Sequence, residues 1–353
     1  MASRREVRKK AGLIARYFPD GLLRHIVDPR STRGRAWKSH LPFLKAILVG
    51  LACGCRGLKD VEKLTKQMSR PVRKLLGITR TIPDTTLRDF VCKIDPDQIS
   101  RVLYIVGYDA WRRKALRQDE RFPFGILSLD GKYPSVRDIG DEEAGDVYEY
   151  LQVQHDKDKI ATHGLIRTIT ATLIAAAGRP VLGAVPVPGD SNEVGVFKNV
   201  FAEMVRIYGG LFDLVMYDAG AASKANGKAV VDAKKNYFFQ IANSKWVMYQ
   251  TMELLFRDKP PSTVHEERVS SRKRIVRELT VLPAKKTRKS LTLWPHTKSI
   301  FKVYSETFEY GEVTGTKTRY FVSSLESTVL TADKFLELII EILSRVVFRM
   351  SIG

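Results

Sequence analysis

The stretch Phe124-Gly125-Ile126-Leu127-Ser128-Leu129-Asp130-Gly131 decides the fold class. A short apolar run that stops at an Asp-Gly pair is typical of a buried strand followed by a turn. A second run of this kind, residues 211–217, ends at Asp218 before Ala219-Gly220. Helix-like and strand-like patterns alternate around these two runs, which predicts an α/β protein with partly parallel strands.

The two aspartates indicate a chemistry as well as a fold. Side chains just past the carboxyl ends of neighbouring strands meet at one crevice of an open α/β sheet. Asp130 and Asp218 would repel each other there unless a hard divalent cation neutralised them. Two such ions at a pair of carboxylates can activate an attacking oxygen and stabilise a leaving one at phosphorus. Taken singly, each Asp is an ordinary turn residue, because Asp-Gly is the commonest hairpin signal.

Helix signals lie on either side of the second strand. Asp190-Ser191-Asn192-Glu193 has the spacing of a capping box, with Asp190 as the helix cap and Glu193 folding back onto it. A further helix is expected over about residues 223–234, followed by a strand over residues 237–242. Thr331 is expected to cap the last helix of the chain.

These patterns divide the chain into four parts. Residues 1–115 have apolar residues at three- and four-residue spacings, which predicts a helical domain for DNA binding or oligomerisation. Residues 116–244 are expected to form the first part of a catalytic core. Residues 245–318 are expected to form a basic, β-rich insertion, and residues 319–353 a last core strand and helix.

Positive charge is concentrated in two stretches. The chain carries a net charge of +20, of which residues 1–40 contribute +8 and residues 268–302 contribute +10. Two localised basic stretches predict two contact surfaces for double-stranded DNA, and solvated basic loops are the alternative. The candidate DNA-binding residues are Arg4, Arg5, Arg8, Lys9, Lys10, Lys132, Arg272, Lys273, Arg274, Lys285, Lys286, Arg288 and Lys289.

Several classes of protein are disfavoured. The longest apolar run, residues 42–55, contains Lys45 and is too short for a bilayer. Three cysteines fit a reducing compartment. The sequence has no glycine-rich phosphate-binding loop of the kind found in ATPases, and Ser128 lacks the Gly-x-Ser-x-Gly context of a hydrolase nucleophile. We therefore expect a cytoplasmic, nucleoid-associated protein.

Short motifs follow one another along nearly the whole chain, at residues 26–30, 83–86, 125–132, 190–193, 214–219, 236–243 and 319–325. In this order they resemble the motifs of bacterial insertion-sequence DDE transposases of the H-repeat-associated type. Asp190 stands where that group carries Lys. The resemblance implies an RNase H-like mixed sheet with flanking helices and two Mg²⁺ (or Mn²⁺) ions held by Asp, Asp and Glu.

Asp130 and Asp218 would be the first two metal ligands and catalytic residues by this resemblance. The third ligand of the family, a Glu on the last core helix, lies in an Arg-x-His-Trp-x-x-Glu-Asn-like stretch that this chain lacks. Glu341 is the nearest candidate for a catalytic and metal-binding role, and Glu337 is the next. Pairing of Glu341 with Arg345 on the helix surface is the alternative. The resemblance therefore implies a core that is cut short at its C-terminus.

The leading hypothesis is a DNA transposase that cleaves and transfers strands at insertion-sequence ends, as a homodimer on DNA. The alternative is a transposase-derived DNA-binding protein whose incomplete triad leaves no nuclease. An endonuclease that cuts without joining is a further possibility.

Overall fold

The computed structural model describes residues 3–30, 38–116, 120–139, 151–155, 162–176, 178–218, 220–284, 294 and 296–347. The chain divides into two compact units, Met1–Ala110 and Trp111–Gly353. This division falls within a few residues of the expected end of the helical domain at residue 115. Among the described residues, no helix is both long and apolar enough to cross a bilayer.

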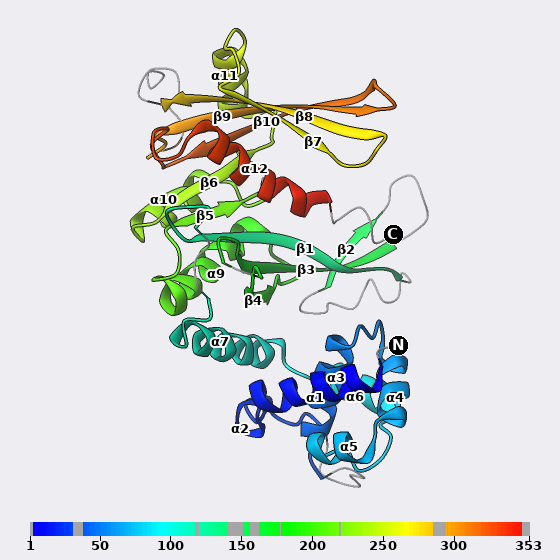
Figure 1. Ribbon diagram of the computed structural model, residues 1–353. Helices are drawn as coiled ribbons and strands as arrows, with labels where there is room; N and C mark the ends of the chain where they lie inside the picture. The colour runs from blue at the N-terminus through cyan, green and yellow to red at the C-terminus, as the bar shows by residue number, and fades with distance from the viewer. Residues whose placement is uncertain are drawn as a thin grey trace. The chain divides into compact units, whose positions relative to one another are not determined.

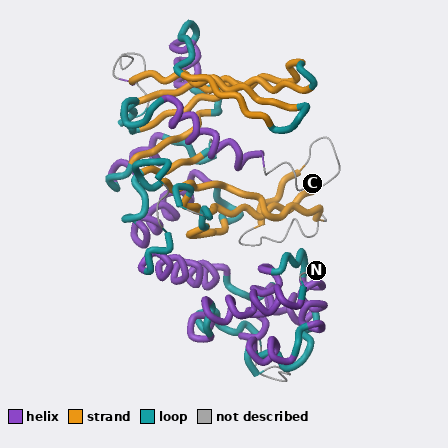
Figure 2. The backbone as a smooth tube through the Cα atoms, in the orientation of Figure 1, coloured by secondary structure: helices purple, strands orange, loops and turns teal. Residues whose placement is uncertain are grey.

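The first unit is helical in its described residues (Figures 1 and 2). Its helices are α1 (Arg4–Tyr17), α2 (Asp20–Leu23), α3 (Leu41–Ala52), α4 (Leu58–Gln67), α5 (Arg70–Leu76), α6 (Asp84–Val91) and α7 (Pro96–Arg112). The longest apolar run of the sequence forms α3, and Phe43, Ala46 and Val49 are fully buried in the unit's core. Gly50 of α3 lies so close to Val61 of α4 that a side chain at this position would overlap it.

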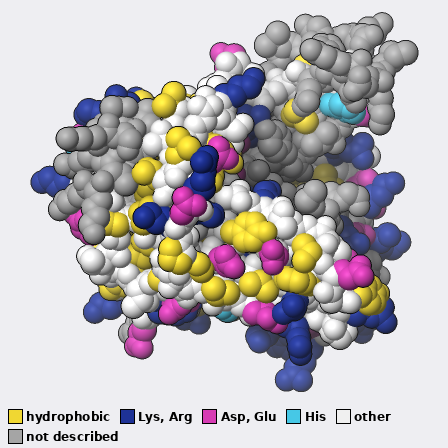
Figure 3. Space-filling view, turned by 90° about the horizontal axis from the view of Figure 1, so that it is seen from above, with side chains coloured by type: hydrophobic (Ala, Val, Ile, Leu, Met, Phe, Trp, Pro, Cys, Tyr) yellow, Lys and Arg dark blue, Asp and Glu magenta, His cyan; other side chains and the backbone are white. Residues whose placement is uncertain are grey.

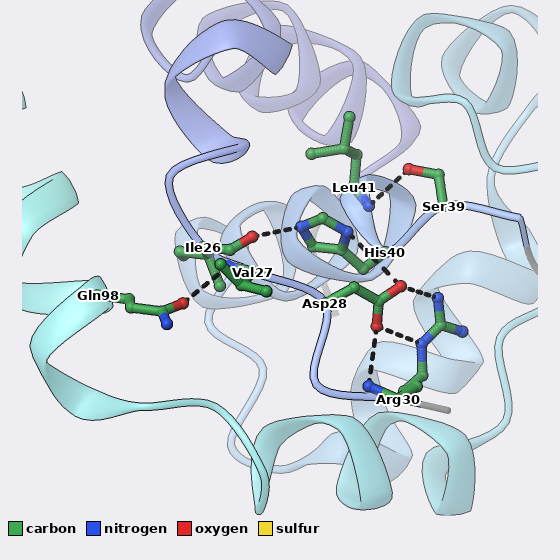
Figure 4. Close-up of polar contacts among 8 residues, drawn as sticks. All are labelled: Ile26, Val27, Asp28, Arg30, Ser39, His40, Leu41 and Gln98. Atoms are coloured by element: carbon green, nitrogen blue, oxygen red, sulfur yellow. Dashed lines mark hydrogen bonds and ion pairs between the residues drawn. The ribbon is translucent and has the colours of Figure 1, made fainter. Parts of the chain in front are cut away.

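The motif at residues 26–30 forms a polar bracket (Figure 4). Asp28 Oδ1 accepts from Arg30 Nε at 2.9 Å, and Asp28 Oδ2 accepts from Arg30 Nη2 at 2.7 Å. His40, just before α3, approaches Asp28 Oδ2 through Nδ1 at 3.7 Å and donates from Nε2 to the Ile26 carbonyl at 2.7 Å. The Arg30 guanidinium also stacks on Phe43, 4.5 Å from the ring centroid. The motif therefore joins the segment after α2 to the start of α3.

Replacing Asp28 by Ala should destabilise the first unit by about 2 kcal/mol, because the partly buried guanidinium of Arg30 loses a charged acceptor. Urea unfolding of the full chain, followed by the transition of the helical unit, measures this change. Asp89→Ala on α6 removes an exposed carboxylate and serves as the control, with an expected change within about 0.5 kcal/mol. Equal effects of the two substitutions would contradict a structural role for the bracket.

The second unit is built on one ten-stranded sheet among the described residues. Its strands are β1 (Ile126–Ile139), β2 (Leu151–His155), β3 (Thr162–Leu173), β4 (Val181–Pro186), β5 (Leu214–Tyr217), β6 (Asn236–Ile241), β7 (Thr263–Arg268), β8 (Lys273–Pro283), β9 (Ser299–Glu309) and β10 (Glu312–Ser323). They lie in the order β2-β3-β1-β5-β6-β10-β9-β8-β7, and β4 also pairs with β3 (Figure 1).

The central strands have the order β4-β3-β1-β5-β6. β1, β5 and β6 are parallel, whereas β3 and β4 form an antiparallel meander with β1. This mixed order is the one expected for an RNase H-like core, and it confirms the α/β fold class. Parallel neighbours need crossover connections, and the helix α9 (Glu193–Tyr208) and the helix α10 (Lys224–Asp232) provide them.

Helices pack on both faces of the central sheet. Leu214 and Met216 of β5 lie in one apolar cluster with residues of the last helix, α12 (Ala332–Val347). Tyr217, which points to the other face, contacts Phe197 of α9 with ring centroids 5.5 Å apart. The alternation along β5 therefore places α12 and α9 on opposite faces.

The basic segment after residue 245 extends the core sheet. It begins with α11 (Val247–Phe256) and continues into β7, β8 and β9. β10 joins these strands to β6 by antiparallel pairing, as in Phe321↔Gln240, so they form a continuous sheet with the core. The sequence predicted the β-rich character but not this continuity, because the pairing of distant strands leaves no local signal.

The first strand is longer than predicted. Its parallel pairing with β5 stops at Leu129↔Tyr217, but its antiparallel pairing with β3 continues past Gly131↔Ile169 to Ile139. The prediction of a turn at Asp130-Gly131 is therefore wrong, since Asp130 lies inside β1. It is nevertheless the first residue of β1 beyond the last pair with β5.

Candidate active site

Asp130 and Asp218 lie side by side on neighbouring strands. Each directly follows the last pair of the β1–β5 ladder, Leu129↔Tyr217, and parallel neighbours are about 4.8 Å apart. Asp130 is 6% exposed, and Asp218 is half-buried. Asp218 Oδ1 accepts a hydrogen bond from the backbone N–H of Gly220 at 3.0 Å, which orients its carboxylate. The structure thus brings together the two aspartates that the sequence singled out.

A third carboxylate, that of Glu193, lies next to this pair. The helix α9 begins at Glu193, and its N-cap is Asn192, whose side chain accepts from Gly195 N at 3.0 Å. The prediction of Asp190 as the cap is therefore wrong, because Asn192 occupies the position from which a side chain reaches the first turn. Glu193 is 7% exposed and accepts a hydrogen bond from the Tyr217 hydroxyl at 3.1 Å. Its Oε1 also lies 3.7 Å from Arg167 Nε.

Glycines leave the space that the Glu193 carboxylate occupies. A Cβ on Gly131, directly after Asp130, would overlap the Glu193 carboxylate. A Cβ on Gly220, two residues after Asp218, would overlap Glu193 Oε2 and lie 3.2 Å from Asp218 Oδ1. The glycine that follows each aspartate is thus required for the approach of the same third carboxylate.

Tyr217 reports the electrostatics of the site. Burial raises the pKa of its hydroxyl far above the usual value, and the carboxylates of Glu193, Asp218 and Asp130 raise it further. The hydroxyl therefore stays protonated and remains a donor to Glu193 across the physiological pH range. All three carboxylates therefore lie close enough to the Tyr217 hydroxyl to disfavour its ionisation.

Sequence reasoning missed Glu193 as a functional residue. The residues before it are all common helix caps, so the stretch was interpreted as a capping box. The available signal was a glycine shortly after each aspartate, Gly131 after Asp130 and Gly220 after Asp218. A turn alone does not require a glycine at both places.

Glu341 lies apart from the two aspartates. It is 8% exposed on α12, and its Oε1 accepts from Arg121 at 3.1 Å and from Arg179 at 2.6 Å. Arg179 lies in the segment after β3. Ile174, the first residue of that segment, donates its backbone N–H to the carbonyl of Ile126 at the start of β1. Asp130 lies four residues further along β1 than Ile126, which places it about 13 Å from that end of the strand.

The arginines that hold Glu341 explain this placement. Arg121 also lies 3.6 Å from Glu337 Oε1, so both glutamates of α12 are engaged with cations at the start of β1. The structure therefore does not bring Glu341 or Glu337 to Asp130. In this arrangement Glu341 fixes α12 against the sheet.

The candidate DNA-binding residues that the structure describes fall into three groups. Arg4, Arg5, Arg8 and Lys9 are exposed on α1, with Lys10 half-buried, while Val7, Ala11 and Ile14 of the same helix face the core. Lys132 lies 3.7 Å from Asp130 Oδ2. Arg272, Lys273 and Arg274 lie at the turn between β7 and β8. Lys285, Lys286, Arg288 and Lys289 lie outside the described residues.

Oxygen ligands suit a hard divalent cation such as Mg²⁺, which is often held by only one or two carboxylates of the protein. Asp130, Asp218 and Glu193 supply such oxygens, and Gly131 and Gly220 leave room for the Glu193 carboxylate. Within the described ranges, no three His, Cys, Asp or Glu side chains are already grouped as they would be around a bound ion. The fit to the cation therefore rests on the oxygen chemistry of these carboxylates and on the pairing of Asp130 with Asp218 at the β1–β5 ladder.

Comparisons with known proteins add little to this geometry. No protein-family model matches the sequence, and no curated protein matches it. Among solved structures, a piggyBac transposase synaptic complex with hairpin DNA is similar with a TM-score of 0.40 and 11% identity. The match covers 90% of this chain and 61% of the piggyBac chain. The fold assignment rests on the strand order and not on this likeness.

Asp130→Asn and Asp218→Asn should each stabilise the metal-free protein by about 1 kcal/mol, because each relieves repulsion between neighbouring carboxylates. Thermal unfolding in a chelator measures the change. The matched control is Asp232→Asn on α10, an exposed carboxylate paired with Lys228, which should change stability by less than about 0.5 kcal/mol. Destabilisation by both site substitutions would contradict a repulsive pair.

Proposed function

We propose that the protein is a metal-dependent phosphoryl-transfer enzyme that acts on DNA, of the kind that cuts and joins strands in transposition. The observation that carries this proposal is the position of Asp130 and Asp218 directly after the last pair of the parallel β1–β5 ladder, with Glu193 against Gly131 and Gly220. In open α/β sheets, ligands bind in the crevice outside the carboxyl ends of the strands.

Each residue has a distinct role in this proposal. Asp130 and Asp218 would hold Mg²⁺, which supplies charge neutralisation and activation of an oxygen nucleophile at phosphorus. Tyr217 donates to Glu193 and orients this third carboxylate. Lys132 extends from β1 beside Asp130, with about half of its side chain exposed, and would meet a phosphate of the bound strand.

The charge distribution supports DNA as the substrate. A net charge of +20 favours a polyanionic partner, and Arg4, Arg5, Arg8 and Lys9 of α1 are exposed. Phosphate contacts of this kind make affinity fall steeply with salt. Homodimerisation on DNA, association with the nucleoid and the action on insertion-sequence ends stay predictions.

Nicking of a supercoiled plasmid that carries the DNA flanking the coding sequence tests this proposal. The parent should nick it in Mg²⁺ or Mn²⁺ but not in a chelator. Asp130→Asn, Asp218→Asn and Glu193→Gln should each lower the rate at least about 100-fold while DNA binding is retained. Glu341→Gln is the matched control on α12, and its nicking rate should fall much less than that of the three variants.

A second candidate is a DNA-binding protein without nuclease activity. The ion pairs of Glu341 with Arg121 and Arg179 favour it, because they engage the glutamate of the last helix elsewhere. Silence of the parent and of Asp130→Asn alike, with intact DNA binding, would support this candidate and contradict the enzyme. A nicked product whose ends are never joined would indicate an endonuclease.

A further inference from the structure

Two turns at one end of the sheet are joined into a single surface. The hairpins β7–β8 and β9–β10, yellow and orange in Figure 1, extend toward the same end. The backbone N–H of Tyr310, in the β9–β10 turn, donates to the carbonyl of Arg272 in the β7–β8 turn at 2.9 Å. Arg272 Nη1 in turn donates to the Tyr310 hydroxyl at 2.9 Å, and its guanidinium lies 5.4 Å from the Tyr310 ring centroid. Backbone and side chain thus hold the two turns together.

The joined turns enclose a basic pocket of about 190 Å³. Four cations line it together with two serines, and no acidic residue does: Arg268, Arg272, Lys273 and Arg274, with Ser270 and Ser271. Guanidinium groups bind phosphate through parallel N–H donors, and hydroxyls are common further donors to it. The lining therefore has the composition of a phosphate site.

Acidic residues nearby neutralise only part of this charge. Lys and Arg side chains stand among Asp and Glu side chains over much of the face seen in Figure 3. Lys273 pairs with Glu309 at 2.7 Å, and Arg274 pairs with Glu266 at 2.9 Å while stacking on Phe308. Within the described part of the chain, no carboxylate lies within ion-pair distance of Arg268 or Arg272, and both side chains are exposed. These two arginines are the charges that remain for a ligand.

Tyr310 occupies its position at a cost in conformation. It forms a two-residue turn with Gly311, and both have positive φ, 54° and 90°. Such turns favour Asn or Gly at the first position, because most other residues are strained at positive φ. Tyr310 is nevertheless 75% exposed, so burial does not offset the strain. The contribution of Tyr310 to the structure is therefore its contact with Arg272.

We propose that the joined turns form a binding site for the backbone phosphates of duplex DNA, with Arg268 and Arg272 as the phosphate ligands and Tyr310 as the residue that positions Arg272. This inference rests on the proposed function for the identity of the polyanion. It assigns part of the DNA contact to a surface formed by two hairpins whose sequences are separated by about forty residues.

Binding of a fluorescent DNA duplex, measured by anisotropy across a salt series, tests the proposal. The Arg268→Ala/Arg272→Ala variant should bind at least about tenfold more weakly at physiological salt. Its slope of log affinity against log salt should fall by about 2, since each neutralised phosphate contributes about 0.9. The matched control, Arg206→Ala/Lys228→Ala, removes two cations that already pair with Glu203 and Asp232, and its slope should not change.

Tyr310→Asn separates a binding role from a structural one. Asn-Gly is the favoured pair for this turn, so the melting temperature should rise by about 2–4 °C. DNA affinity should nevertheless fall, because Arg272 loses the ring and the hydroxyl that hold it. A more stable variant with unchanged affinity would overturn the role given to Tyr310.

The outcomes also separate this inference from the proposed function. Unchanged affinity and salt slope in the double arginine variant would overturn the phosphate site, even if Asp130→Asn abolishes nicking. A parent protein that binds no DNA would overturn both. Weakened binding in the arginine variant, with nicking absent from the parent, would support the site and contradict the enzyme.

Discussion

The parallel pairing of β1 with β5 is the constraint on which the second unit depends. The register Leu129↔Tyr217 sets Asp130 beside Asp218, and a slip of one residue would turn one aspartate to the opposite face. The helices fix this register from both sides, because Leu214 and Met216 are buried toward α12 while Tyr217 is buried toward α9. Packing that looks purely structural therefore determines where the carboxylates lie.

Gathering carboxylates in one place opposes folding, and the surrounding residues limit that cost. Tyr217 donates a hydrogen bond to Glu193, and Arg167 lies near the other oxygen of the same carboxylate. Gly131 and Gly220 give the room that any larger residue would remove. A site with neighbouring carboxylates, two of them at the end of one strand pairing, is suited to bind a cation. A protein selected only for stability would not keep it.

The sequence predicts much of the fold and part of the site. Apolar runs that end in aspartate gave the strands β1 and β5, because burial on both faces leaves a continuous apolar signal. The role of Glu193 could not be found this way, since cap residues precede it and its contacts with Gly131 and Gly220 exist only in three dimensions. The separation of Glu341 from Asp130 was equally hidden, because it depends on how far α12 extends along β1. The joining of the two hairpin turns through Arg272 and Tyr310 is likewise a contact between distant segments.

The most direct test of the central claim is the position of a bound ion in crystals soaked with Mn²⁺, read from its anomalous scattering. We expect a peak between the carboxylates of Asp130 and Asp218, on the side of Glu193, that is lost in crystals of the Asp130→Asn protein. A peak at Glu341, or no peak near either aspartate in well-ordered crystals, would contradict it.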